Sequence, residues 1–302
     1  MVFFCDIDRK IGAHYGGVVT KELSFDLKRG IAYVLLAWLF FTLMTTLAKV
    51  TSAHTTTPMI ILFQNGISLL LLLPWMRKAD FSTDHKGLML VRALFGLANF
   101  ALLLFAVEYT SLVNAMLLCN AAPIFIPLVD WIWRRSPINA KLWPGILLGF
   151  IGIILILNQQ VEINAGALFG IASGICLAVS MLCVRRLSHS DDTKTILFYY
   201  YAIATVCAFI WSFFYWELPS SSILINLVGI GCLSAMGQYL FNKSFTFAKA
   251  VNLGPFNYSA VVYSVLTQWY LWGAVPSWIA CMGILAVCAG GIFTVLFSKP
   301  SP

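Results

Sequence analysis

Charge is scarce in this sequence. Asp, Glu, Lys and Arg make up 10% of its 302 residues, whereas 60% are hydrophobic and the mean hydropathy is +0.87. Soluble domains carry about 25% charged residues. Uncharged stretches of about 20 residues recur along the chain, as in helices that cross a lipid bilayer. The composition excludes an ordinary soluble domain and predicts an all-α integral membrane protein.

Motifs of metal, nucleotide and redox chemistry are also missing. The eight cysteines form no C-x-x-C pair, and the sequence contains neither an H-E-x-x-H helix nor a Walker-type glycine loop. We therefore expect no metal, no cofactor and no enzymatic activity. The formal charge of +7 is explained by membrane topology rather than by nucleic-acid binding. The expected partners are a small-molecule substrate and the lipid bilayer, with the chain acting as a monomer or homodimer.

Windows between charged and turn-forming residues predict ten membrane-spanning helices. Several of the connections are too short to hold a soluble domain. The predicted spans are residues 30–49, 58–76, 88–107, 112–133, 141–157, 165–184, 195–216, 224–242, 253–272 and 277–297.

Basic residues predict the orientation, because loops rich in Lys and Arg stay in the cytoplasm. If alternate loops are cytoplasmic, 18 of the 19 basic residues lie on that side, with Arg92 counted in the loop before its helix. The exception is Lys49. Both termini are then cytoplasmic. Residues 1–29 lack the apolar core of a signal peptide and are expected to form a cytoplasmic or interfacial tail.

The chain resembles itself when it is shifted by 138 positions. Val113 and Asn114 match Val251 and Asn252, Trp131 matches Trp269, and the three residues from Gly145 match the three from Gly283. This indicates two five-helix units, residues 30–157 and 165–297. Because five is an odd number, the second unit enters the membrane inverted, as in many secondary transporters.

Small and polar motifs carry a resemblance to a known family. They are Arg92 with Gly96, Tyr109-Thr110-Ser111 with Asn114-Ala115, Pro123, and the series Gly145, Gly149 and Gly152. With the ten-helix pattern, they resemble the EamA-type branch of the drug/metabolite transporter superfamily. The resemblance implies alternating access around a central cavity. It also implies that predicted helices 1, 3, 4, 6, 8 and 9 line the cavity and that helices 5 and 10 are peripheral.

Predicted helix 4, residues 112–133, contains Pro123 and Pro127. Each proline removes a backbone hydrogen bond, so a bent helix facing the bundle interior is expected. Such a bend could serve as a moving part in transport or as a static kink. Near its end, Asp130 and Arg134 are four residues apart and could form an ion pair that is either structural or a cytoplasmic latch.

Polar and aromatic residues at similar predicted depth are the candidates for substrate binding. The amides could bind substrate or simply hydrogen-bond helices together, and the aromatic residues could wall the cavity or pack elsewhere. These candidates are Trp38, Asn99, Asn120, Gln238, Asn242, Asn257, Tyr258, Tyr263 and Trp269. At the outer side, Lys49 and Glu108 could pair at the mouth, or both could extend separately into water.

The deepest predicted carboxylates, Glu108 and Asp130, lie near helix ends, whereas proton coupling usually needs a deep ionisable group. A cavity without buried charge suits neutral or zwitterionic solutes, or cations held by aromatic rings. We expect an exchanger or facilitator of amino acids or similar metabolites in a bacterial inner membrane. The resemblance adds S-adenosylmethionine as an option. The alternatives are a proton-coupled multidrug or metabolite efflux pump and a non-transporting membrane enzyme or scaffold.

Overall fold

The computed structural model describes residues 27–76, 81–134, 140–157, 165–188, 190–216, 219–247, 253–273 and 277–297. Helices are the regular secondary structure of these ranges, and no strand occurs in them. In chain order the elements are α2 (Leu27–Ser52), α3 (Thr57–Met76), α4 (Lys86–Tyr109), α5 (Leu112–Asn120), α6 (Ala122–Arg134), η1 (Ala140–Leu142), α7 (Trp143–Leu157), α8 (Ala165–Leu187), α9 (Thr193–Phe213), α10 (Ser221–Phe247), η2 (Gly254–Tyr258), α12 (Ser259–Trp272) and α13 (Trp278–Phe297).

Hydroxyl side chains are accommodated inside the apolar helices by bonds to their own backbone. In α2, the Oγ1 atoms of Thr42, Thr46 and Thr51 each donate to the carbonyl four residues earlier, at 2.7–2.8 Å. Ser111 uses its hydroxyl differently, because it accepts from the N–H of Asn114 and so caps the start of α5. The three threonine hydroxyls thus find acceptors within their own helix, and Ser111 provides one for a helix start, as polar groups in a hydrocarbon environment require.

The predicted bend of helix 4 is present as a break between two helices. α5 ends at Asn120 and α6 begins at Ala122, and the axes of the pair differ by 41°. The break lies just before Pro123, whose backbone nitrogen carries no hydrogen and so cannot donate to the hydrogen-bond ladder. Helix 9 is interrupted as well, since the 3₁₀ turn η2 precedes α12.

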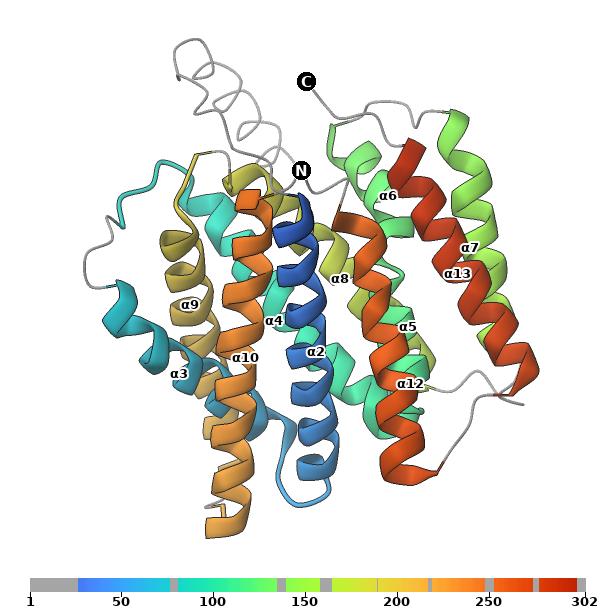
Figure 1. The fold of residues 1–302 in the computed structure, drawn as a ribbon. Helices are drawn as coiled ribbons and strands as arrows, with labels where there is room; N and C mark the ends of the chain where they lie inside the picture. The colour runs from blue at the N-terminus through green and yellow to red at the C-terminus, as the bar shows by residue number, and fades with distance from the viewer. Residues whose placement is uncertain are drawn as a thin grey trace.

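The main helix pairs join the first part of the chain, residues 27–157, to the second, residues 165–297. α2 packs along α10, α4 along α8, and α7 along α13 at one edge of the bundle (Figure 1). At the opposite edge α3 contacts α9 (Figure 1). The first helix of each part thus meets the third helix of the other. The first turn of α2 and the last turn of α13 lie at the same end (Figure 1).

Glycines bring α7 and α13 into backbone contact. A Cβ atom at Gly152 would lie 2.8 Å from the carbonyl oxygen of Gly283, and one at Gly290 would lie 2.6 Å from that of Gly145. Gly283 and Gly290 lie 138 positions after Gly145 and Gly152 and are their counterparts in the repeat. The two contacts are therefore equivalent, with the two parts of the chain exchanged. Small residues permit this close approach in a membrane, where hydrophobic burial does not drive helix association.

The outer surface is apolar, as a protein surrounded by lipid requires. Its most exposed side chains include Phe213, Tyr270 and Trp278, at 71%, 87% and 87%. Six described helices (α2, α3, α4, α8, α9 and α10) are long and apolar enough to cross a bilayer, and α5 with α6 gives a seventh. α7 and α13 carry shorter apolar stretches and α12 has 14 residues. The protein is therefore a multi-pass helical membrane protein, while ten spans remain a prediction.

Candidate functional site

Side chains of seven helices enclose a cavity of about 80 Å³. The helices are α2, α3, α4, α5, α8, α9 and α10. Predicted helices 2 and 7, here α3 and α9, contribute Gln64 and Tyr200, although the resemblance had implied neither helix. α12, the main part of predicted helix 9, contributes none of the described lining residues. The space holds several waters or part of a small solute.

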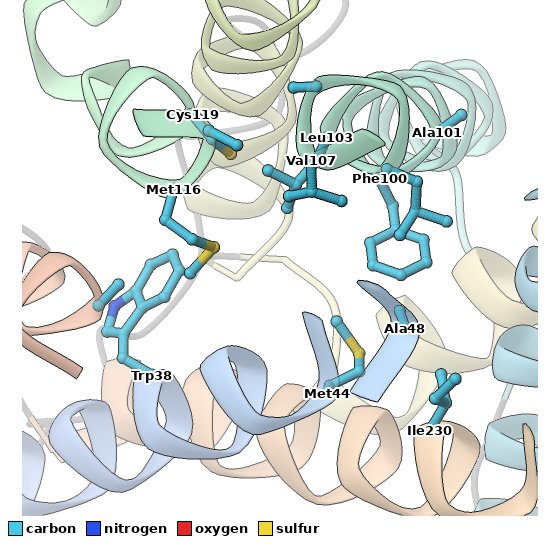
Figure 2. Packing of buried hydrophobic residues seen from close by; sticks show 14 of the residues in the cluster. Trp38, Met44, Ala48, Phe100, Ala101, Leu103, Val107, Met116, Cys119 and Ile230 are labelled. Carbon is cyan, nitrogen blue, oxygen red and sulfur yellow. The ribbon is translucent and has the colours of Figure 1, made fainter. Parts of the chain in front are cut away.

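The walls of the cavity are mostly apolar. Trp38 of α2 points toward Met116 of α5, with Cys119 one turn beyond, while Phe100 and Leu103 approach from α4 (Figure 2). Phe41 and Phe241 add two further rings, each packed edge-on against the indole of Trp38. These rings supply a broad apolar surface on which a few polar groups can orient a ligand.

Three of the predicted amide side chains line the cavity. Asn99 donates from Nδ2 to the carbonyl oxygen and to Oγ of Ser173, at 3.1 and 2.9 Å, which joins α4 to α8. Asn120 donates to the carbonyl of Met116 at 2.8 Å, and its Oδ1 is buried with no partner among the described residues. Gln238 also faces the cavity.

Trp38 is the one predicted aromatic residue among the described lining side chains. Its Nε1 donates to Oδ1 of Asn257 at 2.9 Å, although the two residues are 219 positions apart. Asn257 itself does not line the cavity. Its hydrogen bond instead fixes the indole ring from η2, at the boundary between the two parts of the chain.

The structure places the four other predicted binding residues away from the cavity lining. Asn242 is buried and donates to the carbonyl of Gln238 at 2.8 Å. Tyr258 is buried against Gly291, and Tyr263 packs on the apolar core. Trp269 is 60% exposed on the outer surface, where an aromatic ring suits the membrane interface.

Gln64 is a lining residue that the sequence reasoning did not single out. Its Nε2 donates to Oγ of Ser234 on α10 at 3.0 Å, and its Oε1 is buried with no partner in the described part of the chain. The available signal was an amide in the middle of the apolar range 58–76.

Arg92 is another lining residue that the sequence reasoning missed, and it corrects an expectation. The side chain is 4% exposed and lines the cavity, so the prediction of a cavity without buried charge is wrong. Its guanidinium lies over the ring of Tyr200, 4.3 Å from the centroid. Arg92 is not a loop residue, because α4 begins six residues earlier, at Lys86. Its position inside the predicted range 88–107 was the available signal.

At the predicted outer end, Lys49 and Glu108 take separate partners. Lys49 donates to the carbonyl of Thr110 at 3.1 Å and lies 5.6 Å from the ring centre of Trp272, whereas Glu108 accepts from Oγ1 of Thr57 at 2.8 Å. The direct ion pair between these two described side chains is therefore not formed. α4 ends at Tyr109, which leaves the carbonyl of Thr110 available to the lysine. At this end, Lys49 of α2 and Thr57 of α3 nevertheless both bond to the C-terminal end of α4 and the residue after it.

At the other end, Asp130 of α6 faces Arg186 of α8, with 3.9 Å between Oδ1 and Nη2. The guanidinium of Arg186 also lies over the ring of Trp133. Pro127 is part of α6. The side chains of Pro123 and Arg134 lie outside the described residues, so the predicted contact between Asp130 and Arg134 is not addressed.

Metal-binding groups are not gathered anywhere in the described ranges. No set of three or more His, Cys, Asp or Glu side chains in them could hold a metal ion. The cavity is lined by aromatic, thioether and amide groups with one guanidinium, an arrangement that can bind and orient a solute.

Comparison with known proteins gives one consistent family. A riboflavin transporter of Vibrio cholerae is 24% identical over 82% of this chain and 86% of its own length. The pseudopaline exporter CntI of Pseudomonas aeruginosa is 26% identical over 89% and 94%. An S-adenosylmethionine uptake transporter of Rickettsia conorii is 20% identical over 78% and 81%. The names of these relatives describe transporters rather than enzymes.

A solved crystal structure shares the fold, with a TM-score of 0.62 at 16% identity over 92% of this chain and 98% of that one. The profile of the EamA-like transporter family matches residues 28–158 and again residues 164–296. The chain belongs to the EamA-like transporter family.

Proposed function

We propose that the protein is a secondary transporter that moves a small polar metabolite by alternating access, as an exchanger or facilitator. The observation that carries the proposal is the cavity, where Oε1 of Gln64 and Oδ1 of Asn120 are buried without partners among the described residues. A buried acceptor without a donor is destabilising. A bound solute that carries N–H or O–H groups can supply the missing donors.

Two inverted five-helix repeats, residues 30–157 and 165–297, provide the proposed architecture. The reciprocal pairing of α2 with α10 and of α8 with α4 supports it, as does the family profile that matches twice. Inverted repeats place the substrate between them and allow one to rock against the other. In this proposal ten helices span a bacterial inner membrane, both termini are cytoplasmic, and the chain acts as a monomer or homodimer.

The breaks in predicted helices 4 and 9 support moving parts in both repeats. Asn120, where α5 ends, and Tyr258, where η2 ends, are 138 positions apart and thus correspond in the repeat. Discontinuous helices near the substrate are a recurring feature of transporters. We propose that α6 and α12 change their angles during transport. The contact between Asp130 and Arg186 would then open and close with α6.

The substrate proposal is an amino acid or a solute that resembles S-adenosylmethionine. The names of the relatives cover riboflavin, pseudopaline and S-adenosylmethionine, so kinship supports a metabolite and leaves its identity to experiment. The cavity supports a molecule with an apolar surface and several polar groups, because aromatic rings surround a small number of amides.

Proteoliposomes would test this function. Labelled amino acids and S-adenosylmethionine would be offered to vesicles with and without the same unlabelled solute inside. We expect preloading to accelerate uptake of one compound. Met181→Trp should abolish this uptake by filling the cavity, whereas Met282→Trp, on the exposed surface of α13, should leave it intact.

Two outcomes would count against the proposal. Equal loss of uptake in Met181→Trp and Met282→Trp would remove the cavity as the transport site. Uptake that requires an imposed proton gradient and is unaffected by preloading would instead favour a proton-coupled pump.

A further inference from the structure

Arg92 suggests the chemical class of the substrate. We infer that its guanidinium is the anchor for an oxyanion of the transported solute, foremost a carboxylate. This inference rests on the proposed function, because it assigns a substrate group to the same cavity. The sequence predicted a substrate cavity without buried charge, whereas this inference assigns it a positively charged binding group.

The guanidinium is buried away from acidic partners. Arg92 is 4% exposed, its Nε has no hydrogen-bond partner among the described residues, and no Asp or Glu is found among the described side chains that line the cavity. An arginine keeps its positive charge inside proteins. A buried charge without a counter-charge is strongly destabilising. An anionic group of the solute would provide the missing counter-charge.

Extension of the side chain into the cytoplasm does not account for this geometry. Arg92 lies about 9 Å along the helix from the first residue of α4, at 1.5 Å per residue. From there a long side chain could reach the interface. Instead it lies over the Tyr200 ring and lines the cavity.

Gly96 and Tyr200 together hold the guanidinium in place. A Cβ atom at Gly96 would collide with Nη1 of Arg92 and lie 2.8 Å from Cε2 of Tyr200. Gly96 is one helical turn after Arg92, so the missing side chain makes room for the guanidinium. The ring of Tyr200 packs against the guanidinium, and the two side chains share a hydrogen bond, whereas Nε has no partner among the described residues, which leaves the Nε edge for an acceptor. A carboxylate matches that edge with two parallel hydrogen bonds.

The other unpaired atoms of the cavity complete the description of the solute. Oε1 of Gln64 and Oδ1 of Asn120 are acceptors, which call for donors such as an ammonium or amide N–H. The rings of Phe41, Phe100 and Phe241 provide an apolar wall. The expected substrate therefore carries a carboxylate and at least one hydrogen-bond donor on a partly apolar body, as an amino acid does.

Cys119 provides a reporter of charge inside the cavity. Its thiol lines the cavity, so it can be labelled after all other cysteines are replaced by alanine in the full chain. The probes are the anionic 2-sulfonatoethyl and the cationic 2-(trimethylammonium)ethyl methanethiosulfonates. Each labelling rate is divided by the rate with a free thiol in solution. We expect the anionic reagent to be favoured, and Arg92→Gln to lower this anion-to-cation ratio at least tenfold.

Three variants control the measurement. Arg92→Lys should retain most of the preference, because the positive charge remains. Gly96→Ala should reduce it in part by displacing Nη1. Arg29→Gln removes an equal charge from an exposed residue of α2 and should leave it unchanged. Each variant must elute as a monodisperse peak, and Gly96→Ala keeps the test decisive if Arg92→Gln fails to fold.

The inference is overturned if the ratio does not favour the anion, or if it is the same in the Arg92→Gln and Arg29→Gln proteins. Failure of both reagents to label Cys119 would overturn it together with the proposed transport site. A charge preference that depends on Arg92, in a protein without solute exchange, would support the anion site and contradict the exchange mechanism alone.

Discussion

The two parts of the chain meet in two different ways. Between α7 and α13, glycines let the backbones touch, with 2.5 Å between a Cβ placed at Gly290 and the amide nitrogen of Gly149. Around the cavity, long side chains from both parts leave about 80 Å³ unfilled and Arg92 without a described carboxylate. We infer from the difference that folding depends most on the first region and transport on the second. Mutations in each region should therefore affect different measurements.

The largest expected effect is the loss of stability on Gly290→Val. Its Cβ would meet backbone atoms of Gly145 and Gly149, which cannot rotate away as a side chain can. Overpacking of this kind costs about 1–3 kcal/mol and occasionally more. We expect a melting temperature in micelles that is lower by roughly 5 °C or more, or little folded protein. Uptake per folded molecule should change much less.

Ala289→Val is the matched control, since it places the same valine side chain at an exposed neighbouring position on α13, although it adds one carbon fewer than Gly290→Val. Equal destabilisation by the two variants would show that α13 tolerates no added volume on any face. The backbone contact between α7 and α13 would then not be the cause of the lost stability.

The reverse pattern is expected for Asn120→Ala. The side chain donates within its own helix to Met116, and its Oδ1 has no partner in the described ranges, so little stability should be lost. A lost substrate hydrogen bond of about 1.5 kcal/mol corresponds to roughly a tenfold lower rate of exchange. Initial rates of uptake, normalised to folded protein, would measure the change.

Asn65→Ala is a close control for Asn120→Ala. Asn65 also donates to the carbonyl four residues earlier, at 2.8 Å, and also buries an unpaired Oδ1, but it is not among the described lining residues. If Asn65→Ala slows exchange as much as Asn120→Ala, the effect belongs to buried amides in general. The cavity would then have no special role.

Helix positions and local breaks could be predicted from the sequence because they depend on local chemistry. The predicted range 58–76 became Thr57–Met76, and the range 165–184 became Ala165–Leu187. Prolines in the range 112–133 correctly indicated a bent helix. Such features follow from hydropathy and backbone geometry, which neighbouring residues determine.

The direction in which each side chain points was much harder to predict. Trp38 faces the cavity and Trp269 the outer surface, although both are tryptophans in apolar helices. Arg92, near the start of its helix, could equally have extended into water at the predicted cytoplasmic end. Its inward position depends on Tyr200, which is distant in sequence. The rotation of each helix is determined by such tertiary contacts, so hydropathy alone does not reveal it.

A moderate effect is expected at the boundary between the cavity and η2. Asn257→Ala leaves Nε1 of Trp38 buried without its acceptor, which costs about 1–3 kcal/mol. Trp38→Phe removes the indole N–H, so that no acceptor from Asn257 is needed. In the Trp38→Phe background, Asn257→Ala should therefore cost less by about 1 kcal/mol, as measured by a double-mutant cycle of unfolding in micelles. Additive effects would show that the bond contributes nothing to joining the two parts.

The smallest effect is expected at the predicted outer end, for Glu108→Gln. The carboxylate is exposed and accepts a hydrogen bond from Thr57, and an amide oxygen can accept the same bond. Surface changes of this kind usually alter stability by no more than about 0.5 kcal/mol. The pH dependence of exchange should also be unchanged, because the proposed exchanger or facilitator does not use Glu108 to carry protons. Uptake that a proton gradient drives and that Glu108→Gln abolishes would contradict this and assign proton coupling to Glu108.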